Sequence, residues 1–185
     1  MRDQLWWYVA RSGGIVALAL SGLSVLWGLL LSTKVLDGRP GPRWLLDLHR
    51  FLGGATVAFT GIHVAGLMLD SFVAFSLIDV LVPFASAWNP GAVAWGIIAF
   101  WLLLAVQISS MLMTRIPRKW WRIIHFTSYG LFWAGLVHGA TAGTDASNPI
   151  YIVGFSLLTL ATVFLTGYRV LAVRRRGRPA ALASS

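Results

Sequence analysis

Cysteine is absent from the 185 residues, and this removes several kinds of metal and redox chemistry at once. Without thiolates the chain cannot form disulfides, thiolate metal sites or iron–sulfur clusters, and it lacks the C-x-x-C-H pattern that attaches haem covalently. Charge is scarce too, because charged residues make up 11% of the chain, against roughly a quarter in soluble domains. Metal chemistry must therefore use the four histidines, the six acidic residues or the few remaining sulfur and hydroxyl groups.

Apolar residues dominate the composition. They make up 57% of the chain, and the mean hydropathy of +0.74 is typical of an integral membrane protein. A net charge of +9 would suggest nucleic-acid binding in a soluble protein. Here the basic residues flank apolar segments, a placement that indicates membrane topology and contact with anionic lipid. We therefore expect the lipid bilayer as a partner and no nucleic acid.

Five uncharged stretches are long enough to cross a bilayer as helices, which takes about 20 residues each. We expect an all-α bundle of five transmembrane helices, with spans at residues 12–33, 51–69, 91–114, 123–144 and 146–168. Residues 71–88 are apolar but contain Asp79 and Pro83, so we expect a short interfacial helix or loop there, or a buried loop. The domain organisation expected is an external segment 1–11, a transmembrane domain 12–173 and a basic cytoplasmic tail 174–185.

Lysine and arginine are missing from the second and fourth connections between these spans, which hold only Asp70, Asp79 and Asp145. The other connections and the tail hold 13 basic residues, so the positive-inside rule predicts an external N-terminus and a cytoplasmic C-terminus. Arg2 and Arg11, before the first span, favour the opposite orientation but are outnumbered. The first span is too long for a signal peptide and has no cleavage pattern behind it, so we expect it in the mature protein.

All four histidines lie on the second and fourth expected spans. His49 and His63 are 14 residues apart, and His125 and His138 are 13 apart. Both spans run from inside to outside, so the histidines form an inner and an outer pair at matched depths, about 20 Å apart along the membrane normal. Fourteen residues end about 40° short of whole helical turns, whereas thirteen end about 140° short. A bend or bulge at Gly130 or Gly135 would accommodate the second interval.

Two depth-matched histidine pairs are what two b-type haems require, because low-spin haem iron takes one imidazole from each side. A neutral imidazole brings no charge into the membrane, and its second nitrogen can donate to a carbonyl. A single histidine in a span would more often be a hydrogen-bonding core residue or a proton relay. We expect two haems b per chain, stacked between the second and fourth spans. His49 with His125 would ligate the inner iron, and His63 with His138 the outer iron.

Basic residues beside the inner pair are candidates for binding haem propionates, since an arginine can bond a carboxylate through two donors. Arg50 adjoins His49, and Arg122 precedes His125 by three residues. The remaining inner basic residues are explained by topology. No basic residue is expected at the outer site, whose propionates would rely on water, hydroxyl groups or backbone N–H groups. No catalytic side chain is expected.

This pattern resembles the ferric reductase-like transmembrane domain family over about residues 44–168. The family includes the membrane domains of NADPH oxidases and ferric reductases, and the haem-binding subunit of the bacterial periplasmic methionine sulfoxide reductase system. The resemblance rests on Leu48-His49-Arg50 with His63, and on Trp121-Arg122-Ile123-Ile124-His125 with His138. It also covers the unequal intervals of the two histidine pairs. It implies electron transfer from a cytoplasmic donor, through the inner and then the outer haem, to an external redox protein or ferric iron.

Family members with a cytoplasmic flavin and nicotinamide domain carry it after the last span, and no G-x-G-x-x-G fingerprint is found here. We therefore expect electrons from a separate cytoplasmic flavin reductase or a quinol, as for bacterial stand-alone haem-binding subunits of the cell membrane. One alternative is a quinone-linked cytochrome b membrane-anchor subunit of a respiratory oxidoreductase. Another is a non-redox carrier that uses histidines as a proton path. The carrier ranks last because no acidic residue or lysine lies inside an expected span.

Overall fold

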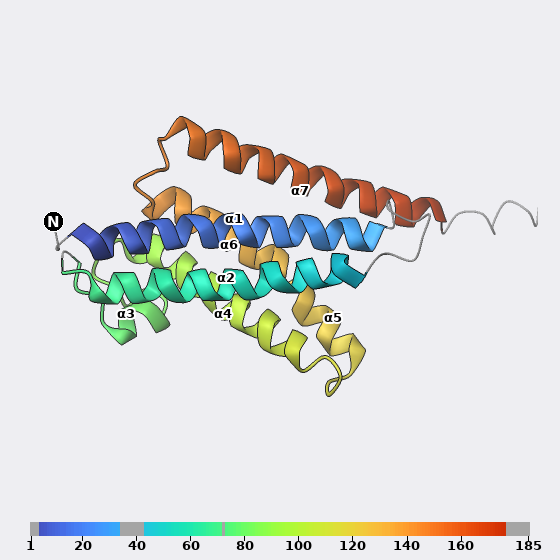
Figure 1. Ribbon diagram of the computed structural model, residues 1–185, viewed down its shortest axis with the longest axis horizontal. Helices are drawn as coiled ribbons and strands as arrows, with labels where there is room; N and C mark the ends of the chain where they lie inside the picture. The colour runs from blue at the N-terminus through green and yellow to red at the C-terminus, as the bar shows by residue number, and fades with distance from the viewer. Residues whose placement is uncertain (1–3, 34–42, 72, 177–185) are drawn as a thin grey trace, which may run out of the picture.

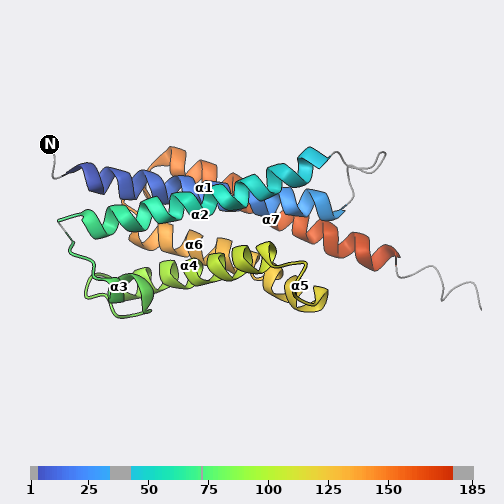
Figure 2. The same ribbon diagram turned by 60° about the horizontal axis from the view of Figure 1, so that its bottom comes forward.

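The computed structural model describes residues 4–33, 43–71 and 73–176, and within them every regular element is a helix. The elements are α1 (Leu5–Thr33), α2 (Arg43–Leu69), α3 (Leu77–Leu81), α4 (Pro90–Met111), α5 (Arg118–Phe126), α6 (Ser128–Ala142) and α7 (Pro149–Arg176). Helices α1 and α2 run antiparallel and side by side along the long axis of the molecule (Figure 1). Helices α4 and α6 form a second layer beside them (Figure 2), and α7 packs against α1.

Four helices of the described chain are long and apolar enough to cross a membrane, namely Leu5–Ser32, Arg43–Leu69, Pro90–Met111 and Pro149–Leu171. Large apolar side chains cover their outer faces, and on α7 Ile150 and Phe164 are 84% and 72% exposed. An apolar surface of this extent is compatible with lipid and not with water. The fold is that of an all-α integral membrane protein that crosses the membrane several times.

The expected span at residues 123–144 is not one continuous helix, which corrects the sequence prediction. It is divided at Thr127 into α5 and α6. The N–H of Thr127 donates to the carbonyl of Ile124 at 3.0 Å, three residues back instead of four, and its hydroxyl donates to the same carbonyl at 2.7 Å. Such local bonds compete with the α-helical ladder. The interruption expected between the two histidines is present, but Gly130 and Gly135 lie within α6 and do not form it.

Other boundaries shift by a few residues. Helix α1 begins at Leu5, inside the segment 1–11 that was expected to precede the first span, and α7 extends to Arg176, past the expected boundary at 174. The segment 71–88 contains the short helix α3. The basic residues Arg2, Lys34, Arg39 and Arg178, which contributed to the orientation argument, lie outside the described residues.

A capping box begins α3. The hydroxyl and the backbone N–H of Ser76 donate to Asp79 Oδ2 at 2.7 and 2.8 Å, and the Asp79 N–H reaches the Ser76 hydroxyl at 3.4 Å. The hydroxyl bond, followed by the backbone bond, lowers the pKa of the Asp79 carboxyl. The connection between α2 and α4 is therefore locally ordered by its own polar groups.

Helices α1 and α4 support the two helices that carry the histidines. Helix α1 packs against α2, α6 and α7, and α4 packs against α6, α5 and α2. The centre of the α1–α6 contact is the fully buried Phe132 with Leu18, Val25 and Leu29. Within the described chain, α2 and α6 form no extensive direct interface. The histidine-bearing helices are therefore held apart by their neighbours instead of packing on each other.

Candidate functional site

The four histidines come together as two pairs, one at each end of the bundle. The ring centroids of His49 and His125 are 5.9 Å apart with an interplanar angle of 69°, and those of His63 and His138 are 6.2 Å apart at 76°. His49 and His63 both lie on α2, whereas the break at Thr127 places His125 on α5 and His138 on α6. The break lets residues 13 apart reach partners that are 14 apart on a continuous helix.

Backbone carbonyls fix the orientation of the outer pair. Nδ1 of His63 lies 2.6 Å from the carbonyl oxygen of Ala10 on α1, and Nδ1 of His138 lies 2.8 Å from that of Ala92 on α4. A carbonyl oxygen only accepts, so Nδ1 is the protonated nitrogen in both rings. Nε2 is then left with a free lone pair on each ring, the tautomer that a metal ligand needs.

Hydroxyl groups take the same place at the inner pair. Ser24 Oγ lies 3.4 Å from Nδ1 of His49, and Ser110 Oγ lies 3.4 Å from Nδ1 of His125. Trp121 stacks on the ring of His125, with centroids 4.9 Å apart and planes at 24°. The sequence had placed Trp121 only among residues of the membrane interface, because stacking one helical turn away has no separate sequence signal.

Each pair offers two ligands to a single metal ion. Bonds of about 2 Å from a metal to each ring nitrogen place the two ring centres about 6 Å apart, which is the separation at both pairs. Among the described residues, no group of three or more His, Cys, Asp or Glu side chains could hold a metal ion. The pairs therefore suit a metal whose remaining ligands belong to a cofactor, as the four porphyrin nitrogens of haem do.

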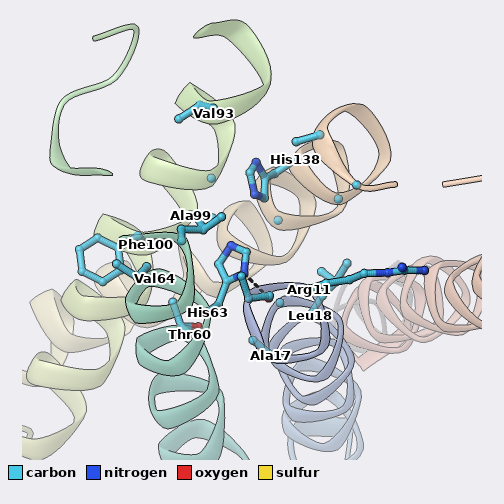
Figure 3. A pocket seen from close by; sticks show the side chains of 18 of the residues that line it. Arg11, Ala17, Leu18, Thr60, His63, Val64, Val93, Ala99, Phe100 and His138 are labelled. Carbon is cyan, nitrogen blue, oxygen red and sulfur yellow. Dashed lines mark hydrogen bonds between the residues drawn. The ribbon is translucent and has the colours of Figure 1, made fainter. Parts of the chain in front are cut away.

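A cavity of about 230 Å³ surrounds the outer pair and separates α2 from α6. The side chains of His63 and His138 project into it from these two helices, and apolar groups such as Val93 and Phe100 line much of the wall (Figure 3). His49 and His125 do not line this cavity. The outer histidines thus border an apolar space between helices, where a flat apolar cofactor would displace little water.

One basic residue does reach the outer site, which corrects the expectation that none would. Arg11, on α1, lines the cavity and makes a two-donor ion pair with Asp145 in the connection between α6 and α7. Its side chain extends away from the two rings (Figure 3). The hydrogen bond from Arg11 lowers the pKa of the Asp145 carboxyl. The available signal was the position of Arg11 at the start of an apolar helix, which had served only as a topology cue.

A buried carboxyl group also borders the cavity. Asp70, just after α2, is 7% exposed and lines the same wall as Arg11. Its N–H donates to the Gly66 carbonyl at 3.0 Å, while its Oδ1 has no hydrogen-bond partner within the described chain. The external end of the cavity is therefore its polar end.

The two arginines proposed for propionate binding are exposed at the inner end of the bundle. Arg50 lies 3.4 Å from Asp47 in an exposed ion pair on α2, a type of contact that contributes little to stability. Arg122 is exposed on α5, and neither residue lines the outer cavity. Their role at the inner pair stays a prediction.

Comparison with known proteins gives one match. No curated protein and no solved structure matches the chain. Residues 13–136 match the family described as "Ferric reductase like transmembrane component". The match includes His49, His63 and His125 and ends two residues before His138. The matched part is more than half of the chain, and the chain therefore belongs to the ferric reductase-like transmembrane component family.

Proposed function

We propose that this protein transfers electrons across a membrane and holds two b-type haems, one between His49 and His125 and one between His63 and His138. Bound haem supplies an iron that is reduced and oxidised by one electron at a time. The observation that carries the proposal is the pairing of all four histidines at two levels, with ring centroids 5.9 and 6.2 Å apart. Membership of the ferric reductase-like family supports the same function.

The surroundings of the histidines support haem over an ordinary core role. A core histidine needs hydrogen bonds for both nitrogens, or water, when it is buried. Here Nδ1 of each outer ring is bonded to a carbonyl, while the two rings approach each other across an apolar cavity. An unprotonated Nε2 facing another Nε2 gains nothing from that neighbour, because neither can donate. A shared metal satisfies both lone pairs.

For the membrane arrangement, we propose that α5 and α6 together form a fifth, interrupted crossing. The exposed basic residues of the α4–α5 connection would then face the cytoplasm, and Asp70 and Asp145 would face outward. Arg11 opposed this orientation as an isolated charge, but its ion pair with Asp145 neutralises it at the outer surface. The N-terminus would be external, the C-terminus cytoplasmic, and the location the cell membrane.

The charge of the inner end suggests the nature of the electron donor. We define the inner basic patch as the exposed residues Arg115, Arg118, Lys119 and Arg122. A patch of one sign attracts a partner of the opposite sign and speeds its association. We propose an acidic flavin reductase as the cytoplasmic donor, with a quinol as the alternative, and an external redox protein or ferric iron as the acceptor at the outer end.

Haem quantitation with single-histidine variants tests this proposal. The purified protein should contain two haems b per chain by pyridine haemochrome assay, with a reduced-minus-oxidised spectrum typical of bis-histidine iron. His63→Ala should remove the outer haem and keep most of the inner one, and His49→Ala should do the reverse. Each variant is thus the control for the other.

Two results would contradict the proposal. Protein purified from haem-replete cells without haem would exclude the function, and full haem content in either histidine variant would exclude the pairing. Loss of both haems in both variants would show that the two levels are not independent sites, which also contradicts it.

A further inference from the structure

Three of the four histidine rings rest against a glycine of a neighbouring helix. A Cβ atom added to Gly14 would lie 2.8 Å from Nδ1 of His63, and one added to Gly96 would lie 2.8 Å from Nδ1 and Cε1 of His138. One added to Gly28 would lie 3.2 Å from Cε1 of His49. Any other amino acid would collide with the outer rings and crowd the inner one.

The hydrogen-bond acceptor of each ring lies four residues before its glycine. Ala10 precedes Gly14, Ser24 precedes Gly28, and Ala92 precedes Gly96 by this interval. In an α-helix a side chain leans over the turn on its N-terminal side and so covers the residue four positions earlier. Glycine leaves that position open. The ring can then lie flat on the helix with Nδ1 directed at the acceptor.

The repeat on α1 matches the repeat on α2. Ala10 and Ser24 are 14 residues apart, as are Gly14 and Gly28. This is also the interval between the two α2 histidines that they contact. Because α1 and α2 are antiparallel, the N-terminal half of α1 serves His63 and the C-terminal half serves His49. One helix therefore holds both histidines of its neighbour by the same arrangement.

His125 is held differently. Its acceptor is Ser110 on α4, and the residue four positions later is Thr114, not glycine. Its ring is covered by Trp121 from its own helix. This exception follows from its position on the short helix α5, which reaches only the end of α4.

We propose that Ala10 with Gly14, Ser24 with Gly28, and Ala92 with Gly96 are orientation clamps, positioning residues that fix the plane and the tautomer of three haem-ligating histidines. The inference rests on the proposed haem-binding function. The clamps hold the paired rings 69° and 76° from coplanar. Perpendicular axial imidazoles leave two iron d orbitals nearly equal in energy, so low-spin ferric iron gives a strongly anisotropic EPR signal. Ring orientation is therefore a measurable property.

The test replaces each clamp glycine with alanine in the full-length protein and compares it with glycines in open space. Gly54 and Gly61 on α2 have no atom within 4 Å of an added Cβ, so Gly54→Ala and Gly61→Ala are matched controls. Gly14→Ala and Gly96→Ala should weaken outer haem retention about 10- to 100-fold, as loss of a ligand's supporting contacts does. Any remaining outer haem should show an altered EPR signal, and the inner signal should be unchanged. Gly28→Ala should change the inner signal alone.

Ser24→Ala gives a second variant that does not add bulk. It removes the acceptor of His49 Nδ1 and leaves the space at Gly28 intact. The inner haem should be retained, with a raised midpoint potential because its ligand becomes a weaker electron donor, and with a changed EPR signal. Ser32→Ala is the control, since the Ser32 hydroxyl bonds within α1 to the Leu29 carbonyl.

The outcomes separate this inference from the proposed function. Wild-type protein with two bis-histidine haems, together with clamp variants that match their controls, would refute the clamps and leave the function standing. Loss of both haems in every clamp variant would also refute them, because the effect would be global and not local. Wild-type protein without haem would refute both.

Discussion

Replacing Gly66 with alanine should weaken the contact between α1 and α2 and disturb the outer histidine pair. Gly66 is buried on α2, one turn after His63. A Cβ atom added there would lie 2.7 Å from the backbone N of Ala10 and 2.9 Å from its Cα. These are main-chain atoms in the middle of a helical turn, so no side-chain rotation can relieve the collision.

The size of the effect follows from these distances. An ordinary contact begins near 3.4 Å, so α1 must retreat by about 0.7 Å from the 2.7 Å contact. The hydrogen bond of 2.6 Å from His63 Nδ1 to the Ala10 carbonyl would then lengthen toward the limit of hydrogen bonding. Overpacking costs about 1–3 kcal/mol, and the weakened hydrogen bond about 0.5–1.5 kcal/mol. Alanine returns about 1 kcal/mol through its higher helix propensity.

Gly61→Ala isolates the packing part of this sum. Gly61 lies on the same helix and an alanine there meets no atom within 4 Å, so it gains the helix propensity without the collision. The free energy of unfolding should therefore be lower for Gly66→Ala than for Gly61→Ala by about 2–4 kcal/mol. Unfolding in mixed micelles, followed by far-ultraviolet circular dichroism, measures the difference. Equal stability of the two variants would refute the close approach of α1 and α2 on which the outer site depends.

Three further predictions concern charge and topology. The pKa of Asp145 is lowered by Arg11, so the stabilising contribution of this pair should be complete above about pH 4 and be lost as the pH falls through the depressed pKa. Asp145→Asn should flatten this acid dependence of the melting temperature, and an unchanged acid limb would contradict the pairing. Reduction of the haems by an acidic flavin reductase should slow as salt rises, and reversing charges in the inner basic patch should remove that dependence; a rate indifferent to both would exclude electrostatic docking. Because the chain has no cysteine, Ser147→Cys should react with a membrane-impermeant thiol reagent in intact cells while Met113→Cys should not, and the opposite pattern would reverse the proposed orientation.

The sequence was sufficient to predict the helical membrane class and the pairing partners of the histidines. Apolar runs of about 20 residues have few alternatives to membrane helices. The intervals between His49 and His63, and between His125 and His138, restrict which rings can share a level. The structure brings together the same two pairs. Their role as haem ligands stays a prediction.

What the sequence did not reveal depends on contacts between distant segments. The partner of Arg11 is Asp145, 134 residues away, and becomes visible only when α1 packs beside the α6–α7 connection. The break at Thr127 involves no proline, and a threonine that bonds back to its own helix looks in the sequence like any other threonine. Gly14 and Gly96 resemble ordinary small packing residues until the imidazole that lies on each of them is known.

The break between α5 and α6 also sets where the chain can tolerate a change in length. On the continuous helix α2, a single residue inserted between His49 and His63 would rotate one imidazole by about 100° relative to the other. Whole pairs of turns, close to seven residues, are the smallest insertions that would keep both rings facing the partner helix. At Thr127 the α-helical ladder is already interrupted, and a one-residue change there can be absorbed by the turn. Length variation between the two histidines should therefore accumulate on the α5–α6 side and be excluded from α2.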